Sequence, residues 1–329
     1  MRVLVTGGAG YIGSHCVRAL LAAGHEPVVL DNLCFGHRSA VSGCRLLEVD
    51  LLDAGGVEAA VREVRPEAVM HFAAFLFVGE SVSEPLKYYR NNVIGSIHLL
   101  EAMQRSGVRN LVFSSTCATY GQPERLPITE QTPQQPINPY GASKLMVERI
   151  LQDSAAAWGL GSTALRYFNV AGASADGSIG EDHEPEIHLI PRVLFALCGR
   201  LGHIDLYGED YPTPDGTCIR DYIHVEDLAR AHVLALEANK EGRFEAYNVG
   251  TGRGTSVREI IAAAEAVTGR PCPVRVGPRR AGDPAELWAD PSKLKGALGW
   301  EPRYAKIEDI VRTAWQWHER HPEGYGDRP

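Results

Sequence analysis

Apolar and polar positions alternate along the first half of the chain with two different periods. Short apolar runs of the kind that form buried strands are followed by longer stretches in which apolar residues recur every three or four positions, the helical period. This pattern predicts strands at 3–5, 27–30, 46–49, 68–72, 111–113 and 163–168, and helices at about 12–23, 54–65, 86–103 and from residue 140 onward. Such alternation is typical of an α/β fold with a doubly wound parallel sheet.

The alternation weakens beyond about residue 170. The later residues are richer in Gly, Asp, Glu and Pro, with a short strand at 204–207 and helices near 226–236, 257–267 and 307–317. We expect a larger sheet domain over residues 1–170 and a smaller C-terminal α/β domain over residues 171–329. The segment near 225–250 is a candidate to return to the main sheet, and the polar tail after His318 is expected to fray.

A glycine-rich turn connects the first strand to the first helix. Gly7, Gly10 and Gly13 stand where a tight turn, close approach to a pyrophosphate and close helix packing each exclude a side chain. The next strand ends at Asp31, 18 residues after Gly13, close to the spacing at which a carboxylate meets the hydroxyls of an adenosine ribose. Because a carboxylate repels the 2′-phosphate of NADP, this arrangement predicts an NAD site. The alternative is that Asp31 only caps the next turn, as the following Asn32 would allow.

Composition narrows the class of protein. The 329 residues are 44% hydrophobic and 22% charged, which is ordinary for a globular chain. The net charge of −8 argues against general nucleic-acid binding but permits a local basic pocket for a small anion. The seven cysteines form no CxxC pair and show no metal-ligand spacing, so we expect reduced thiols and no metal. The first strand begins at Arg2, and no apolar run reaches the roughly 18 residues of a membrane span, which predicts a cytoplasmic location and no membrane partner.

A tyrosine and a lysine give the strongest chemical signal. Tyr140 and Lys144 are four residues apart, so on a helix they share one face. A free phenol titrates near pH ~10, and a nearby positive charge stabilises the phenolate, which would let Tyr140 act as a base. Thr116 follows the strand at 111–113, where its hydroxyl can bond a substrate hydroxyl. Taken alone, the Tyr–Lys pair could also lie on a solvated helix face. Thr116 alone could simply hydrogen-bond the backbone at the end of the strand.

Together these elements resemble the extended, nucleotide-sugar-modifying branch of the short-chain dehydrogenase/reductase superfamily. Further runs narrow the resemblance to the UDP-glucose 4-epimerase family and extend it over nearly the whole chain; they lie at 71–74, 78–81, 91–93, 165–169, 211–213, 215–217, 220–225 and 289–290. By this resemblance the larger domain is an NAD-binding Rossmann domain, and the smaller one binds a UDP-sugar.

The resemblance implies a redox-neutral isomerase of galactose metabolism that interconverts UDP-glucose and UDP-galactose. Tyr140 takes the proton of the 4-hydroxyl, the C4 hydride passes to NAD, and the 4-keto sugar rotates before the hydride returns to its other face. The catalytic residues are then Tyr140, Lys144 and Thr116. The implied NAD site consists of Gly7, Gly10, Tyr11, Ile12, Gly13, Asp31, Asn32, Asp50, Leu51, Phe72, Ala73, Ala74, Asn91, Tyr140, Lys144 and Tyr167. The implied substrate site consists of Thr116, Asn169, His188, Leu189, Tyr207, Arg220, Arg280, Asp283 and Leu287. The helices near 86–103 and 140–158 are expected to pair in a homodimer.

Three residues depart from the better-known family pattern. Thr116 stands where serine is frequent, Leu76 where some members place a lysine near the cofactor, and His188 where asparagine is common. Two rival functions share the fold: a nucleotide-sugar 4,6-dehydratase and a non-catalytic NAD-sensing regulator. Dehydratases of this kind typically carry Asp-Glu after the threonine, whereas Cys117 and an alanine follow here. The complete set of threonine, tyrosine and lysine argues against a regulator.

Leu287 aligns with the position that flanks the C2 substituent of the sugar in the family. A tyrosine there excludes N-acetylated sugars, and a serine or cysteine admits them. Because leucine still fills volume and offers an amide no hydrogen-bond partner, we expect UDP-glucose and UDP-galactose as the main pair and weaker turnover of UDP-N-acetylglucosamine. The alternative is that Leu287 only packs in the core.

Overall fold

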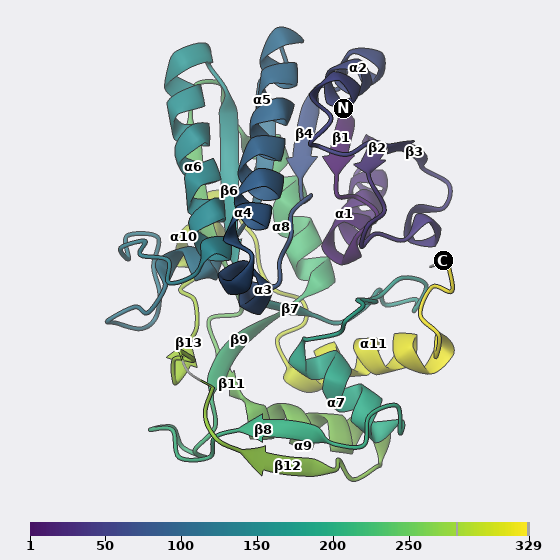
Figure 1. Cartoon of the computed structure of the whole chain (residues 1–329), viewed down its shortest axis with the longest axis vertical. Helices are drawn as coiled ribbons and strands as arrows, with labels where there is room; N and C mark the ends of the chain where they lie inside the picture. The colour runs from purple at the N-terminus through teal and green to yellow at the C-terminus, as the bar shows by residue number, and fades with distance from the viewer. Residues whose placement is uncertain (281, 328–329) are drawn as a thin grey trace.

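A central sheet of seven parallel strands organises the computed structural model, which describes residues 1–280 and 282–327 (Figure 1). The strand order is β10-β6-β5-β4-β1-β2-β3. The strands are β1 (Arg2–Thr6), β2 (Glu26–Asp31), β3 (Arg45–Glu48), β4 (Ala68–His71), β5 (Asn110–Thr116), β6 (Gly161–Tyr167) and β10 (Phe244–Val249). The chain runs outward from β1 in one direction and then returns to start β4 on its other side, so a crevice opens between the carboxyl ends of these two strands. The predicted doubly wound α/β fold is confirmed.

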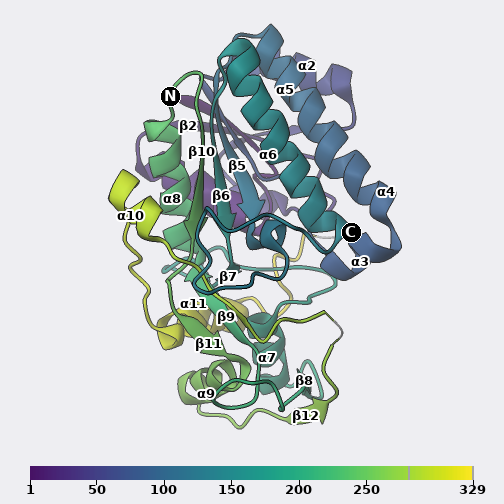
Figure 2. The same cartoon turned by 90° about the vertical axis from the view of Figure 1, so that its left-hand side faces the viewer.

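Helices cover both faces of this sheet (Figures 1 and 2). On one face lie α1 (Tyr11–Ala22), α8 (Val225–Ala238) and α10 (Ser292–Leu298); on the other lie α2 (Ala54–Val64), α5 (Gly95–Arg105) and α6 (Pro139–Trp158). Val3 and Val5 of β1 belong to the first core and Leu4 to the second, because successive side chains of a strand point to opposite faces. No helix among the described residues is long and apolar enough to cross a bilayer.

The single helix expected at 86–103 is divided in the structure. After α3 (Val78–Ser83) come α4 (Pro85–Tyr88), a π-helix, η2 (Tyr89–Ile94), and then α5. The Asn92 side chain accepts from the Phe75 N–H (2.8 Å) and donates to the Phe75 carbonyl and the Ser143 hydroxyl. These bonds tie the wide π turn to the β4 loop and to α6, and hydrophobic spacing does not reveal them. Short 3₁₀ helices, η1 (Arg38–Val41) and η3 (Cys117–Tyr120), also escaped prediction.

A second lobe, the lower one in Figure 1, packs beneath the carboxyl ends of the main strands. Its core joins α7 (Leu189–Leu197), α9 (Val257–Thr268) and α11 (Ile307–Arg320). The second sheet consists of β7 (Asn169–Ala171), β9 (Ile219–His224), β11 (Gly254–Ser256) and β13 (Glu286–Leu287), and a separate parallel pair consists of β8 (Ile204–Tyr207) and β12 (Val274–Gly277). Strand β10 pairs with β6 in the main sheet, and α8 packs on that sheet, so the segment near 225–250 returns to the main sheet. The predicted division of the chain at residue 170 stays a proposal.

The C-terminal tail is held against the protein as far as Asp327. The Asp327 carboxylate lies 2.6 Å from Nδ1 of His37, and the Tyr325 ring stacks on the same imidazole with ring centres 4.6 Å apart. The expectation of a frayed tail is therefore wrong for these residues, because polar side chains far away in the sequence bind them.

Candidate active site

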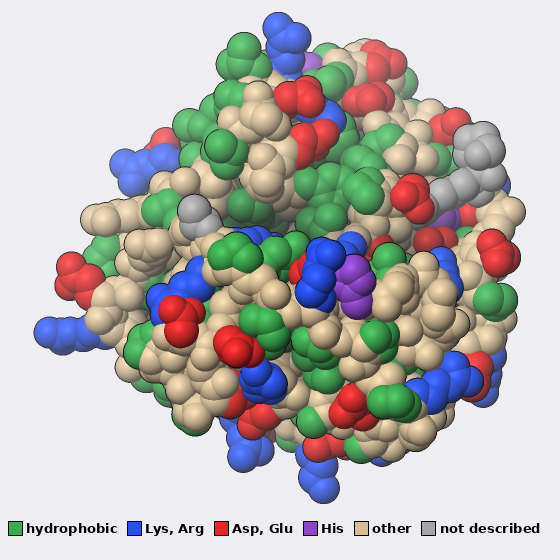
Figure 3. Space-filling view, turned by 60° about the horizontal axis from the view of Figure 1, so that its bottom comes forward, with side chains coloured by type: hydrophobic (Ala, Val, Ile, Leu, Met, Phe, Trp, Pro, Cys, Tyr) green, Lys and Arg blue, Asp and Glu red, His purple; other side chains and the backbone are tan. Residues whose placement is uncertain are grey.

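A cavity of about 540 Å³ lies where the main strands end against the lower lobe. Figure 3 shows the molecule hollowed between the main-sheet part and the lower lobe, with hydrophobic side chains inside the hollow. Every residue predicted for the NAD site lines this cavity, and so do the predicted catalytic residues. The predicted substrate residues line it too, except Leu287. The structure therefore brings together side chains that the sequence scatters from residue 7 to residue 283.

The glycine turn fits a pyrophosphate. Gly7 has φ +69°, a conformation that L-residues rarely adopt, and a side chain at Gly13 would collide with the Gly7 carbonyl oxygen. Helix α1 begins at its N-cap Gly10 without a side-chain capping bond. The N–H groups of the first helical turn are thus not covered by a side chain at the cavity wall, where a helix N-terminus favours an anion.

Asp31 combines the two roles that its position allowed. Its carboxylate accepts from the Ala9 N–H (3.0 Å) and from the Leu33 N–H (2.9 Å), so it does cap the following turn. It also lines the cavity at 7% exposure. Burial raises the pKa of Asp31, and its bonds from backbone N–H groups oppose that rise. A fixed carboxylate at this position fits ribose hydroxyls, and together with the glycine turn it makes the cavity suitable for NAD.

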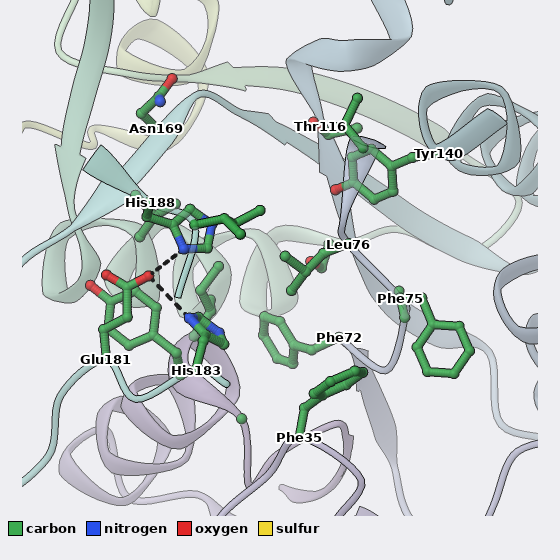
Figure 4. Close-up of a pocket in the computed structure, with 18 of the residues that line it drawn as sticks. Phe35, Phe72, Phe75, Leu76, Thr116, Tyr140, Asn169, Glu181, His183 and His188 are labelled. Atoms are coloured by element: carbon green, nitrogen blue, oxygen red, sulfur yellow. Dashed lines mark ion pairs between the residues drawn. The ribbon is translucent and has the colours of Figure 1, made fainter. Parts of the chain in front are cut away.

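The Thr116, Tyr140 and Lys144 side chains lie at one end of the cavity. Asn138 caps α6 by accepting from the Gly141 N–H (2.8 Å), which places Tyr140 in the first helical turn. Tyr140 is 9% exposed and Lys144 is 3% exposed. In Figure 4 the Thr116 side chain lies beside the Tyr140 ring.

Burial dominates the electrostatics at this end of the cavity. The ammonium of Lys144 donates to the Ser114 carbonyl oxygen (2.8 Å) and lies 4.9 Å from the centre of the Phe113 ring. Burial raises the pKa of Tyr140 well above its usual range, opposed by a bond with Thr116, and burial lowers the pKa of Lys144 to about 7. In the protein alone, Lys144 therefore does not offset the effect of burial on the Tyr140 pKa, and its role beside the phenolate stays a prediction. A tyrosinate here requires a further positive charge.

At the end of the cavity that carries the predicted substrate residues Arg220 and Arg280, both guanidinium groups already pair with a carboxylate of the protein. Arg280 donates to the Asp283 carboxylate (3.0 Å), and Arg220 lies 3.9 Å from the other oxygen of the same group. The Arg280 guanidinium also stands 4.9 Å from the centre of the Tyr207 ring. Asn169 lines the same region. This acidic chain therefore presents two guanidinium groups to one end of its cavity.

Leu287 lies outside the cavity lining. It sits on the two-residue strand β13 and packs against a small core of Tyr120, Ile128, Phe168 and Ala289. Of these residues Phe168 lines the cavity, so Leu287 borders the site only through a neighbour. Its role in sugar selection stays a prediction.

Several lining residues were not identified from the sequence. The Phe35 ring contacts the Phe75 and Phe77 rings edge to face, with ring centres 5.8 and 5.5 Å apart. Phe35 and Phe75 line the cavity. Ser114 shares a 2.5 Å hydrogen bond with the Tyr167 hydroxyl. Aromatic residues on irregular loops carry no periodic signal, so only their closeness in sequence to Asp31 and Ala74 pointed toward the site.

Two further lining residues, Glu181 and His183, form a cluster with Glu186 and His188. Burial disfavours charge on both imidazoles, yet the neighbouring carboxylates raise the pKa of His183 to about 9 and that of His188 to about 10. The spacing Glu-x-His-x-x-Glu-x-His was the available sequence signal. His188, predicted as a substrate residue, is thus tied to the loop that precedes α7.

Comparison with known proteins gives a consistent result. The model of the "NAD dependent epimerase/dehydratase family" matches residues 3–250. The UDP-glucose 4-epimerase of Lacticaseibacillus casei is 52% identical over 100% of both chains. The crystal structure of UDP-glucose 4-epimerase from Brucella ovis in complex with NAD has 53% identity and a TM-score of 0.92, and the match covers 95% of this chain and 97% of that one. The enzyme from Bifidobacterium longum in complex with NAD⁺ and UDP has 40% identity and a TM-score of 0.93, with 98% and 100% covered.

Proposed function

Because the chain belongs to the NAD dependent epimerase/dehydratase family, we propose that it interconverts UDP-glucose and UDP-galactose by inverting C4. The observation that carries this function is the grouping of Thr116, Tyr140 and Lys144 in the same cavity as the glycine turn. The enzyme is an NAD-dependent isomerase, and relatives about half identical to it over their full length bear that activity in their names.

The NAD site begins at the first turn of α1, where backbone N–H groups would hold the pyrophosphate. Asp31 would bind the adenosine ribose, and Lys144 would hold the nicotinamide ribose. When bound, NAD accepts the C4 hydride and returns it, and its oxidised ring brings a positive charge to this end of the cavity. That charge is of the kind that the buried Tyr140 phenol needs in order to ionise.

Tyr140 would move the proton of the substrate. Its ionised hydroxyl takes the proton of the 4-hydroxyl as the ketone forms, and returns it when the ketone is reduced. Thr116 would hydrogen-bond the same sugar hydroxyl and so hold the C4 oxygen against the tyrosine. Lys144, fixed on the Ser114 carbonyl, holds its ammonium in place during this exchange.

The UDP end would be bound by Arg220 and Arg280. Guanidinium groups pair with phosphate in a two-pronged geometry, and both arginines now face the single carboxylate of Asp283. UDP binding would therefore redistribute these contacts and leave the sugar free to turn about its bond to the diphosphate. Asn169, His188, Leu189 and Tyr207 complete this proposed end of the site.

A dehydratase function is not favoured. Elimination across C5 and C6 needs an acid and a base near Thr116, and the next lining residues are Cys117 and Ala118. Burial raises the pKa of the Cys117 thiol to about 11, which makes it a poor base at neutral pH.

We expect a homodimer and a cytoplasmic location, as the sequence suggested. Apolar side chains on α3, α4 and α6 support the dimer: Val82 is 64% exposed, Leu86 71% and Met146 45%. Light scattering on the purified protein checks the mass, and Leu86→Glu should shift it toward the monomer.

The function is tested by incubating purified protein with UDP-galactose, with and without added NAD. We expect UDP-glucose to form, without added NAD if the protein retains its cofactor through purification. Failure to form UDP-glucose in either reaction, or formation of a 6-deoxy-4-keto sugar, would refute the proposal. Running UDP-N-acetylglucosamine in parallel, on wild type and Leu287→Ser, tests sugar selection: weak turnover that rises in the variant is the proposed result.

A further inference from the structure

The loop between β7 and α7 gathers two carboxylates and two imidazoles at one point. Nδ1 of His188 lies 2.9 Å from Glu181 and 2.9 Å from Glu186, and Nδ1 of His183 lies 3.2 Å from Glu181 and 3.6 Å from Glu186. One potential ligand atom from each side chain lies within 4.8 Å of all the others. Figure 4 shows both imidazoles turned toward Glu181.

The charge of this cluster requires a partner. The side chains of Glu181 and Glu186 are each only 5% exposed, so water screens their mutual repulsion poorly. Two imidazolium ions would balance them, and so would one divalent cation bound by two neutral imidazoles. Both arrangements have the same net charge, so charge alone does not distinguish them.

Unsatisfied atoms distinguish them. Among the described residues, Oε2 of Glu186 and Nδ1 of His183 are buried without a hydrogen-bond partner, and the two atoms face each other at 3.6 Å. A proton shared between them would shorten that distance to about 2.8 Å, the usual length of a charge-assisted bond. Buried polar atoms without a hydrogen bond indicate a bound water or ion, and a divalent ion would in addition neutralise the two carboxylates.

The spacing also fits an ion. Four ligands at about 2.0–2.1 Å from Zn²⁺ in a tetrahedron lie roughly 3.3 Å from one another. The separations of 2.9, 3.2 and 3.6 Å between neighbouring ligand atoms lie around that value, and the widest pair, within 4.8 Å, would close as the side chains turn toward the ion. Imidazole nitrogen together with carboxylate oxygen is a donor set that suits Zn²⁺ and related transition metals rather than Mg²⁺ or Ca²⁺.

The loop is held in place by contacts outside the cluster. The Tyr325 N–H donates to Asp182 (3.0 Å), and the Gly180 N–H donates to the Tyr325 hydroxyl (3.0 Å). Arg192 donates to the Glu186 carbonyl oxygen (3.3 Å). These bonds position the four ligands before any ion binds, which lowers the cost of binding it.

We propose that Glu181, His183, Glu186 and His188 form a binding site for a divalent transition-metal ion of the Zn²⁺ class. The ion clips the loop to the N-terminus of α7, where His188 is the N-cap residue and Leu189 the first helical residue. It thereby fixes one wall of the cavity. This proposal departs from the sequence-based expectation of no metal, and it stands whether or not the proposed reaction is correct.

The test uses full-length protein without an affinity tag, stripped with EDTA and titrated with Zn²⁺ by calorimetry. We expect one tight site per chain, weakened at least about 100-fold in Glu186→Gln, since even losing an outer-shell partner costs 10–100-fold. The matched control is Glu184→Gln, which removes the same charge from an exposed position of the same loop outside the cluster and should keep the wild-type affinity. All seven cysteines remain in both variants, so any Zn²⁺ binding to thiols is the same in wild type and in the variants.

Two outcomes would overturn the site: no stoichiometric binding to wild type, or equal affinity in wild type and Glu186→Gln. Thermal melting checks that the variant folds. If it does not fold, wild-type crystals soaked in Zn²⁺ decide the matter by anomalous diffraction at the zinc edge. A peak among the four side chains supports the site, and peaks elsewhere only, or none, contradict it.

Discussion

At the scale of single residues, the proposed chemistry rests on Tyr140, whose pKa burial raises well above its usual range in the protein alone. Tyr140→Phe removes the hydroxyl that carries the proton and leaves the capping of α6 by Asn138 intact. We expect the rate of epimerisation to fall by about 10²–10⁴, the usual contribution of general acid–base catalysis, with unchanged NAD content. Tyr304→Phe is the control, because its hydroxyl binds Glu226 away from the cavity. A Tyr140→Phe enzyme within a few-fold of wild type would remove Tyr140 from the mechanism.

We propose that one side chain, Asp31, also decides the choice between NAD and NADP. The Asp31 carboxylate is held rigidly by two backbone N–H groups, so it cannot turn away from a 2′-phosphate. We expect wild type to contain NAD, and Asp31→Ser to narrow the gap between NAD and NADP affinity. Mass spectrometry of the cofactor released on denaturation identifies what wild type contains. Fluorescence titration measures the affinities for NAD and NADP. NADP as the main cofactor of wild type would contradict the assignment.

At the scale of elements, hydrophobic spacing predicted the helices and strands whose apolar residues recur with a regular period and are buried. It missed the elements that polar contacts hold in place. Strand β1 was predictable because its apolar positions are buried, and helix α1 because Val17 and Leu20 lie in the core, although Leu21 is 52% exposed. The π-helix was not, since Asn92 holds it through bonds to Phe75 and Ser143. The proposed catalytic residues follow from motifs on regular elements, whereas the Glu181–His188 cluster lies on a loop without a period.

Helix α6 is anchored to the sheet by a buried ion pair. Arg166 of β6 donates to Glu148 at 2.6 and 3.0 Å, and the two side chains are 5% and 1% exposed. We expect Glu148→Ala to lower the free energy of unfolding by about 3–5 kcal/mol, because it leaves the buried guanidinium without a carboxylate and bonded only to Tyr120 and Gln134. Asp153→Ala on the same helix removes an exposed pair and should change it by at most about 1 kcal/mol. Urea denaturation compares them, and equal losses would show that burial of the pair contributes little.

At the scale of the whole molecule, the C-terminal tail joins the two lobes at the cavity. Asp327 binds His37 on the main-sheet side of the molecule. Tyr325 binds Asp182, in the loop between β7 and α7. Deleting residues 322–329 should lower the melting temperature and weaken NAD binding, since each charged hydrogen bond lost costs about 1.5–3 kcal/mol. Asp327→Asn should reproduce only part of the loss. Unchanged melting and NAD affinity in the deletion would show that the tail is passive.

The central claim is that one cavity removes a hydride from C4 of a UDP-hexose and returns it to the same carbon. The most direct measurement is NMR of the UDP-glucose formed from UDP-galactose that carries deuterium at C4. The account predicts full retention of deuterium at C4, because the deuteride moves from carbon to carbon and a C–D bond does not exchange with water. Deuterium lost to solvent or moved to C6 would contradict it.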